Sequence, residues 1–144
     1  MMTSTAGTAL KAAAAIVTGF GAIVALAALP STAGIANLLA DLVFWPLNGL
    51  PRIDTPAAHL LAAIAGGVLV GWGVTLWFVV AHVLPKDAVA ATGTIRAGIL
   101  SWFVVDSLAS IAAGAPLNAV LNIAFVALFL WPLAMLARPI ASRH

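Results

Sequence analysis

The sequence predicts an all-α fold, a bundle of four transmembrane helices with a short interfacial helix between the first and second spans. Of its 144 residues, 64% are hydrophobic and only 7% are charged, and the mean hydropathy is +1.17. A soluble domain, which must cover itself with polar side chains, does not reach such values. The chain also contains four apolar stretches of roughly 20 residues or more, the length that crosses a bilayer at about 1.5 Å per residue. We therefore expect a single integral membrane domain over residues 1–144, with the lipid bilayer as its main partner.

The first span is predicted over residues 10–29, where Pro30 stops the helix. Its small residues Thr18, Ala22 and Ala25 fall near one face, as in helices that pack closely in lipid. The segment is also similar to a secretory signal peptide, because a lysine stands at its start and small residues follow the apolar run. We expect it to be retained as the first helix of the bundle.

An amphipathic helix is predicted over residues 33–45, in the connection to the second span. Ile35, Leu38 and Leu42 recur at helical spacing, and a tryptophan follows them. A helix this short does not cross the bilayer, so we expect it to lie along the membrane interface with its tryptophan as an anchor. A re-entrant segment is the alternative.

The second span, residues 57–84, carries the clearest packing signal. Ala63, Gly67 and Gly71 lie four residues apart, a spacing that lets two helix backbones approach closely. Such a face serves contacts within a bundle or between subunits, and we favour contacts within the bundle. The second helix is therefore expected to be central, with Gly67 and Gly71 facing another helix.

The third and fourth spans, residues 95–113 and 117–137, contain polar residues that raise the question of function. Asp106 lies about 15 Å along the third span from Arg96, close to the middle of a hydrocarbon core about 30 Å thick. A carboxyl group that faces lipid at this depth is costly. We therefore expect Asp106 to point into the bundle.

Three further residues are expected to join Asp106 in an intramembrane polar cluster. Ser110 lies one turn farther along the same helix, and Asn118 and Asn122 share a face of the fourth helix. The connection is short, so the two helices should pair antiparallel and bring Asn122 near the depth of Asp106. Two roles stay open: the amides and the hydroxyl satisfy a largely neutral carboxyl, or the cluster binds a ligand or handles protons.

His59 and Trp72 on the second span are candidate ligand contacts. His59 lies about 35 Å from His82 along the helix, so the two histidines do not share a metal ion. A hydrogen-bonded interfacial histidine is the favoured interpretation. The chain has no cysteine, which excludes disulfides and thiolate metal sites. We find no pattern of catalytic residues, predict neither a metal site nor an enzyme, and assign no cofactor.

The distribution of basic residues predicts the orientation in the membrane. Five of the six lie on one side of a four-span topology and one lies on the other. The five are Lys11, Lys86, Arg96, Arg138 and Arg143, and the sixth is Arg52. The positive-inside rule then places both termini in the cytoplasm, and we expect the protein in the bacterial inner membrane. The basic residues are spread along the chain and do not form a patch for nucleic acid.

Three motifs in the second half of the chain resemble those of a known group. They are GWG at Gly71–Gly73, WFVVDS at Trp102–Ser107 and NAVLN at Asn118–Asn122. The chain resembles small uncharacterised bacterial four-helix integral membrane proteins that are loosely DoxX-like. DoxX proteins proper are associated with quinone-linked sulfur oxidation, but this resemblance is one of architecture and implies no residue role.

The sequence leaves two main hypotheses for function. The first is a non-catalytic membrane protein, an accessory subunit of a membrane complex or a binder of an apolar small molecule, in which the polar cluster fixes the helix register. The second is a proton-coupled small transporter that works as a homodimer, with Asp106 as the titrating group. A quinone- or haem-binding redox role is a weaker third hypothesis.

Overall fold

The computed structural model describes residues 2–137, which fold into five α-helices. The four long helices are α1 (Met2–Leu26), α3 (Pro56–Phe78), α4 (Ala88–Ala112) and α5 (Pro116–Ala137), and the short one is α2 (Gly34–Val43). A 3-10 turn, η1 (Pro30–Thr32), precedes α2, and a π-helical segment, η2 (Val79–Val83), continues α3. All four long helices are apolar and long enough to cross a membrane. The predicted all-α bundle, with a short helix between its first two spans, is confirmed.

Two helices begin earlier than predicted. α1 begins at Met2 and not near the expected residue 10. α4 begins at Ala88 and not at Ile95, because Asp87 caps it: the backbone nitrogen of Ala90 donates to Asp87 Oδ1 at 2.8 Å. The polar residues that follow do not interrupt the helix, since a threonine hydroxyl in a helix can bond a carbonyl of the preceding turn.

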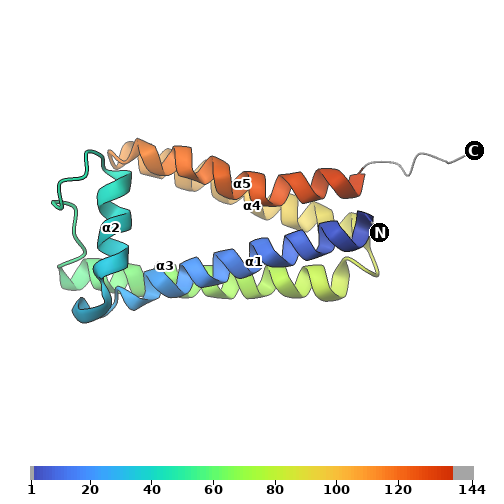
Figure 1. The fold of residues 1–144 in the computed structure, drawn as a ribbon, viewed down its shortest axis with the longest axis horizontal. Helices are drawn as coiled ribbons and strands as arrows, with labels where there is room; N and C mark the ends of the chain where they lie inside the picture. The colour runs from blue at the N-terminus through green and yellow to red at the C-terminus, as the bar shows by residue number, and fades with distance from the viewer. Residues whose placement is uncertain (1, 138–144) are drawn as a thin grey trace, which may run out of the picture.

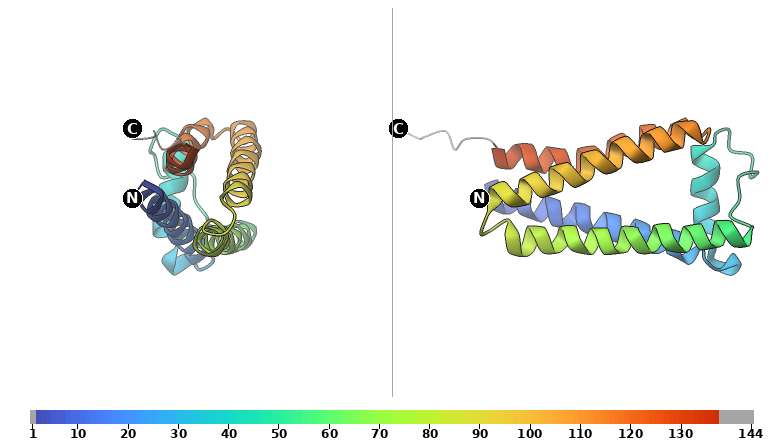
Figure 2. Two further views of the ribbon diagram at one scale, coloured as in Figure 1. Left: turned by 90° about the vertical axis from the view of Figure 1, so that its right-hand side faces the viewer. Right: turned by 180° about the vertical axis from the view of Figure 1, so that it is seen from behind.

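The long helices form two pairs, α1 with α3 and α4 with α5 (Figure 1). The pairs lie close together at the end that holds the N-terminus and the last turn of α5, which we call the closed end (Figure 2). They diverge toward the opposite end, the wide end, where α2 runs crosswise and contacts α1 and α5. A helix that lies along a membrane interface is expected to have this crosswise orientation.

Glycines allow α1 and α3 to approach closely. A Cβ at Gly66 would lie 2.3 Å from the backbone nitrogen of Ala25, and a Cβ at Gly73 would lie 2.3 Å from the hydroxyl oxygen of Thr18. On the facing helix, a Cβ at Gly21 would lie 2.7 Å from a backbone nitrogen of α3. Side chains at these positions would separate the two backbones. The small face predicted for α1 is thus confirmed at Thr18 and Ala25, but Ala22 is exposed, and Gly21 is the residue that faces α3 between them.

The packing face predicted for α3 is wrong. Apart from neighbouring residues of α3 itself, no described residue lies within 4 Å of a Cβ placed at Gly67 or Gly71. Both glycines are exposed, while Ala63 is half-buried. Small residues occur on two neighbouring faces of this helix, and α1 lies against the face that holds Gly66 and Gly73. The expectation that this helix is central also needs correction, because α1 contacts α2, α3 and α5.

A tight turn sets the antiparallel pairing of α4 and α5. The backbone nitrogens of Gly114 and Ala115 donate to the carbonyls of Ile111 and Ser110 at 3.0 and 2.9 Å, the pattern of a Schellman motif. Gly114 has a φ of +81°, a left-handed conformation that favours glycine. Pro116 then begins α5 at a position where its missing N–H costs nothing. The first turns of α5 therefore face the last turns of α4.

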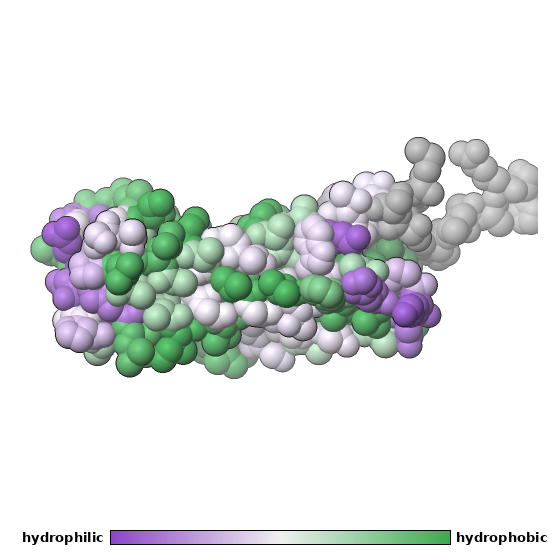
Figure 3. All heavy atoms as spheres, turned by 90° about the horizontal axis from the view of Figure 1, so that it is seen from below, coloured by the Kyte–Doolittle hydropathy of each residue, from purple (hydrophilic) through white to green (hydrophobic). Residues whose placement is uncertain are grey.

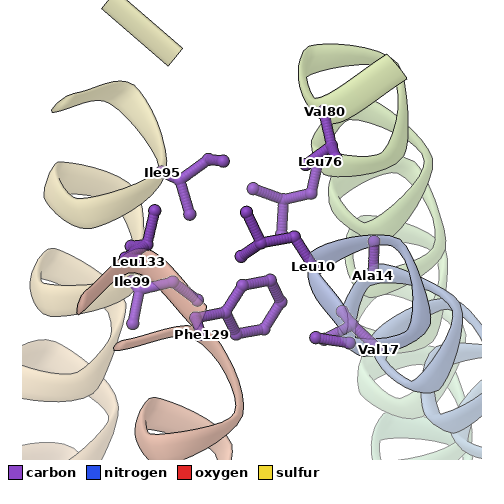
Figure 4. Packing of buried hydrophobic residues seen from close by; sticks show 10 residues of the cluster. Leu10, Ala14, Val17, Leu76, Val80, Ile95, Ile99, Phe129 and Leu133 are labelled. Carbon is purple, nitrogen blue, oxygen red and sulfur yellow. The ribbon is translucent and has the colours of Figure 1, made fainter. Parts of the chain in front are cut away.

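The main hydrophobic core lies toward the closed end, where all four long helices meet. Its side chains point toward one another from both helix pairs (Figure 4). They include Leu10, Val17, Leu76, Val80, Ile95, Ile99, Phe129 and Leu133. The surface in Figure 3 carries polar residues at both ends and apolar residues between them. This distribution is expected of a protein whose middle is surrounded by lipid and whose ends are in contact with water.

Candidate functional site

The polar cluster lies between α4 and α5, in the half of the pair nearer the wide end. Asp106 stands six residues before Ala112, the last residue of α4, and is therefore about 9 Å from that end of the helix. Because α4 begins at Ala88 and not at Ile95, Asp106 lies in the second half of this helix, and its depth in the bilayer stays a prediction. The side chain of Asp106 is half-buried.

Two asparagine amides converge on one oxygen of Asp106. Asn122 Nδ2 donates to Asp106 Oδ2 at 2.6 Å, and Asn118 Nδ2 donates to the same atom at 3.0 Å. The turn after α4 produces this geometry, because it places the asparagine face of α5 opposite the last turns of α4. The structure confirms that Asp106 points toward α5 and that Asn122 contacts it.

Two serines complete the cluster. Asn118 Nδ2 donates to Ser110 Oγ at 2.9 Å, and Asn122 Nδ2 donates to Ser107 Oγ at 3.2 Å. Ser110 therefore joins the cluster through Asn118. From here on, the polar cluster means Asp106, Ser107, Ser110, Asn118 and Asn122.

Ser107 is a member that the sequence analysis missed. It is only 8% exposed, and its partner Asn122 is only 4% exposed, so both are buried in the pair. A serine in a helix can bond its own backbone one turn back, so its presence alone does not predict a side-chain partner. Its three-residue spacing from Ser110, which places both hydroxyls on one side of α4, was the available signal.

The geometry makes Asp106 an acceptor surrounded by donors. Among the described residues, the hydrogen bonds to its carboxyl group all end on Oδ2 and none reaches Oδ1. The cluster can therefore hold the carboxyl group in place while Oδ1 stays available for a proton. Within residues 2–137, no three His, Cys, Asp or Glu side chains lie close enough to hold a metal ion.

An aromatic layer separates the polar cluster from the main core. The ring of Trp72 on α3 lies against Trp102 on α4, with centroids 5.8 Å apart, and Trp102 lies 6.1 Å from Phe125 on α5. Phe125 in turn lies 5.5 Å from Phe20 on α1. These four rings link all four long helices. Trp72, a candidate ligand contact in the sequence, is placed here as a packing residue.

His59 lies far from this layer, about 20 Å from Trp72 along α3. Its Nδ1 is 2.6 Å from the carbonyl oxygen of Ala27, so the ring joins the start of α3 to the end of α1. It also lines an open pocket of about 270 Å³ at the wide end, together with Arg52 and Asp54. The structure therefore does not bring His59 and Trp72 into one site, and it supports the interpretation of His59 as a hydrogen-bonded interfacial residue.

Two polar residues of α2 hold the long loop at the wide end. Asp41 Oδ1 accepts hydrogen bonds from the backbone nitrogens of Asn48 and Gly49, both at 3.0 Å. Asn37 Oδ1 accepts one from the backbone nitrogen of Ile53 at 2.8 Å. Neither residue was predicted from the sequence, because the helical spacing of the apolar residues says nothing about partners on the polar face.

Comparisons of this chain with protein-family models, with curated proteins and with solved structures give no match. Its four long apolar helices make it a multi-pass integral membrane protein.

Proposed function

We propose that the protein is a non-catalytic membrane protein that works by holding another molecule, either as an accessory subunit of a membrane complex or as a binder of an apolar small molecule. The observation that carries this proposal is that the members of the polar cluster hydrogen-bond to one another. Each asparagine amide donates to two other members of the cluster. Such a network fixes α4 against α5 in one register, which gives Asp106 a structural role.

The outward face of α3 supports the accessory-subunit form of the proposal. Gly67 and Gly71 leave a strip on this face that no other helix within residues 2–137 approaches. Another membrane helix can come close to such a strip, because small residues permit backbone contact. A homodimer through the same face is the simplest assembly of this kind.

A proton-coupled transporter is the second candidate, and one observation favours it. Asp106 is half-buried rather than fully buried, and its Oδ1 receives no hydrogen bond from the described residues. An intramembrane carboxyl group that can gain and lose a proton is the usual carrier in proton relays. This candidate needs a path for protons from both sides of the membrane.

We also propose the bacterial inner membrane as the location, with the closed end in the cytoplasm. Lys11, Lys86 and Arg96 lie on helices or loops toward the closed end, and Arg52 lies in the loop at the wide end. The positive-inside rule supports this orientation. The resemblance to DoxX-like four-helix proteins is a further proposal that agrees with the architecture.

Purification in mild detergent, followed by mass analysis and an absorbance spectrum, tests the first proposal. A stoichiometric partner protein or a bound apolar small molecule is the expected result. A homogeneous chain that carries neither would contradict it. Absorbance from haem or a quinone would instead favour a redox role.

Asp106→Asn separates the two candidates. The amide oxygen of the new side chain can accept both asparagine N–H groups, so the fold should be kept, but the side chain carries no titrating proton. If the protein holds a partner, the variant should retain that partner at wild-type stoichiometry. If the protein transports protons, wild-type vesicles should show proton uptake with a pH-sensitive dye, and vesicles of the variant should not.

A further inference from the structure

A second feature of the molecule lies at the closed end, away from the polar cluster. It is a half-open cavity of about 400 Å³ to which all four long helices or their extensions contribute. Most of its wall is apolar, with Val80, Ala81, Leu84 and Leu136 among the lining residues. Lys11 is the one charged side chain in its described lining.

Lys11 has no anionic partner within the described chain. Its ammonium group lies 5.9 Å from the centroid of the Trp77 ring, and it forms no ion pair or hydrogen bond with the described residues. The ring attracts the ammonium group through its quadrupole, but it carries no net negative charge that would neutralise the lysine. Among residues 2–137, this positive charge beside an apolar wall therefore has no negative counterpart.

The π-helical segment η2 shapes one wall of the cavity. Val80 and Ala81 belong to it, and the backbone nitrogen of Leu84 donates to the Val79 carbonyl at 2.9 Å across the widened turn. π-helical segments are rare and occur often at functional sites. Here the widened turn places the small side chain of Ala81 in the wall.

We propose that this cavity binds an anionic phospholipid of the adjacent leaflet, with its phosphate at Lys11 and the start of an acyl chain along Leu84 and Leu136. The charge complements Lys11, and the apolar wall complements the acyl chain. A lysine in a membrane helix extends its ammonium group toward the headgroups, where lipid phosphates lie. The proposal goes beyond the proposed function, because an accessory subunit, a ligand binder and a transporter could each hold such a lipid.

Native mass spectrometry of the purified chain tests the proposal. The protein is mixed with equal amounts of phosphatidylglycerol and phosphatidylcholine that carry the same acyl chains. We expect the wild type to retain phosphatidylglycerol over phosphatidylcholine by about five-fold, the effect of one basic residue near anionic lipid. Lys11→Gln should bring this ratio close to one.

Two further variants keep the test decisive. Lys86→Gln removes an exposed lysine outside the cavity at the same end, and it should leave the ratio unchanged. Ala81→Phe should fill the cavity and abolish lipid retention while Lys11 remains. Equal retention of both lipids by the wild type would overturn the proposal, and so would an equal effect of the two lysine variants. Neither outcome bears on the partner stoichiometry that tests the proposed function.

Discussion

At the scale of single residues, a hydrogen atom in place of a methyl group decides how closely α1 lies against α3. At Gly66 the backbone of Ala25 occupies the space that a side chain would need, whereas no other helix in the described residues comes within 4 Å of a Cβ placed at Gly67. Neighbours in a helix point in directions about 100° apart, so two adjacent glycines face different surroundings. The fold therefore requires one of them and not the other.

Gly66→Ala is expected to lower the free energy of unfolding by about 1–3 kcal/mol, because its methyl group would overlap the backbone of Ala25. Gly67→Ala is the matched control and should leave the stability of the monomeric, partner-free chain unchanged or raise it slightly, since alanine favours a helix. Thermal unfolding in detergent, followed by circular dichroism, compares the two. Equal losses would contradict the close approach of α1 at Gly66.

The polar cluster can be tested at the same scale. Asn122→Leu removes the donor to both Asp106 and Ser107 and should cost about 1–2 kcal/mol of stability. In an Asp106→Leu background the same change should cost less, because its main acceptor is already gone. The difference, a coupling of about 1 kcal/mol, is obtained from a double-mutant cycle. Strict additivity would show that the two side chains do not stabilise each other.

At the scale of helices, length and hydropathy predicted where the spans lie, but they did not predict which faces meet. Small residues occupy two neighbouring faces of α3, and their spacing alone does not indicate which of these faces α1 contacts. The earlier start of α4 was not predicted for a similar reason. Aspartate is common both in loops and at helix N-caps, so Asp87 alone does not indicate that a helix begins after it.

The site was more predictable than the packing, for a physical reason. Polar side chains are scarce in these spans, so Asp106, Asn118 and Asn122 had few other partners once the turn paired α4 with α5. The role of Ser107 was not predicted, because a serine hydroxyl can hydrogen-bond to a carbonyl of its own helix and then needs no side-chain partner. The cavity around Lys11 was not predicted at all, because its walls come from four helices that are distant in sequence.

The helix α2 and its loop provide a prediction at this scale. Asp41→Ala leaves the backbone N–H groups of Asn48 and Gly49 without their acceptor, so the loop should open more often. Amide hydrogen exchange at these two residues should accelerate about ten-fold or more, in keeping with the loss of hydrogen bonds to a charged group. Asp54→Ala, which removes an exposed carboxylate from the same loop, is the control. Equal exchange in both variants would contradict a holding role for Asp41.

At the scale of the whole molecule, both termini should lie on one side of the membrane and the long loop on the other. Single cysteines at Ser142, a position outside the described residues, and at Asn48 test this in a chain that has no cysteine of its own. An impermeant thiol reagent added to intact cells should label the Asn48→Cys protein and spare the Ser142→Cys protein. Labelling of both from outside would overturn the four-span topology.

The division into two helix pairs also implies that the protein can be produced as two separate fragments. A single short loop, between Val83 and Ala88, connects α1, α2 and α3 to the pair of α4 and α5. A break at Lys86 would leave every long helix on the same polypeptide as its closest neighbour, because α1 packs on α3 and α4 on α5. The two fragments, produced separately in one cell, should find each other in the bilayer through the core at the closed end, and a tag on one should recover the other. The protein then consists of two helix groups that associate noncovalently and are joined by one loop. If each fragment were fused to one half of a split reporter enzyme, the reporter activity would measure their assembly in living cells.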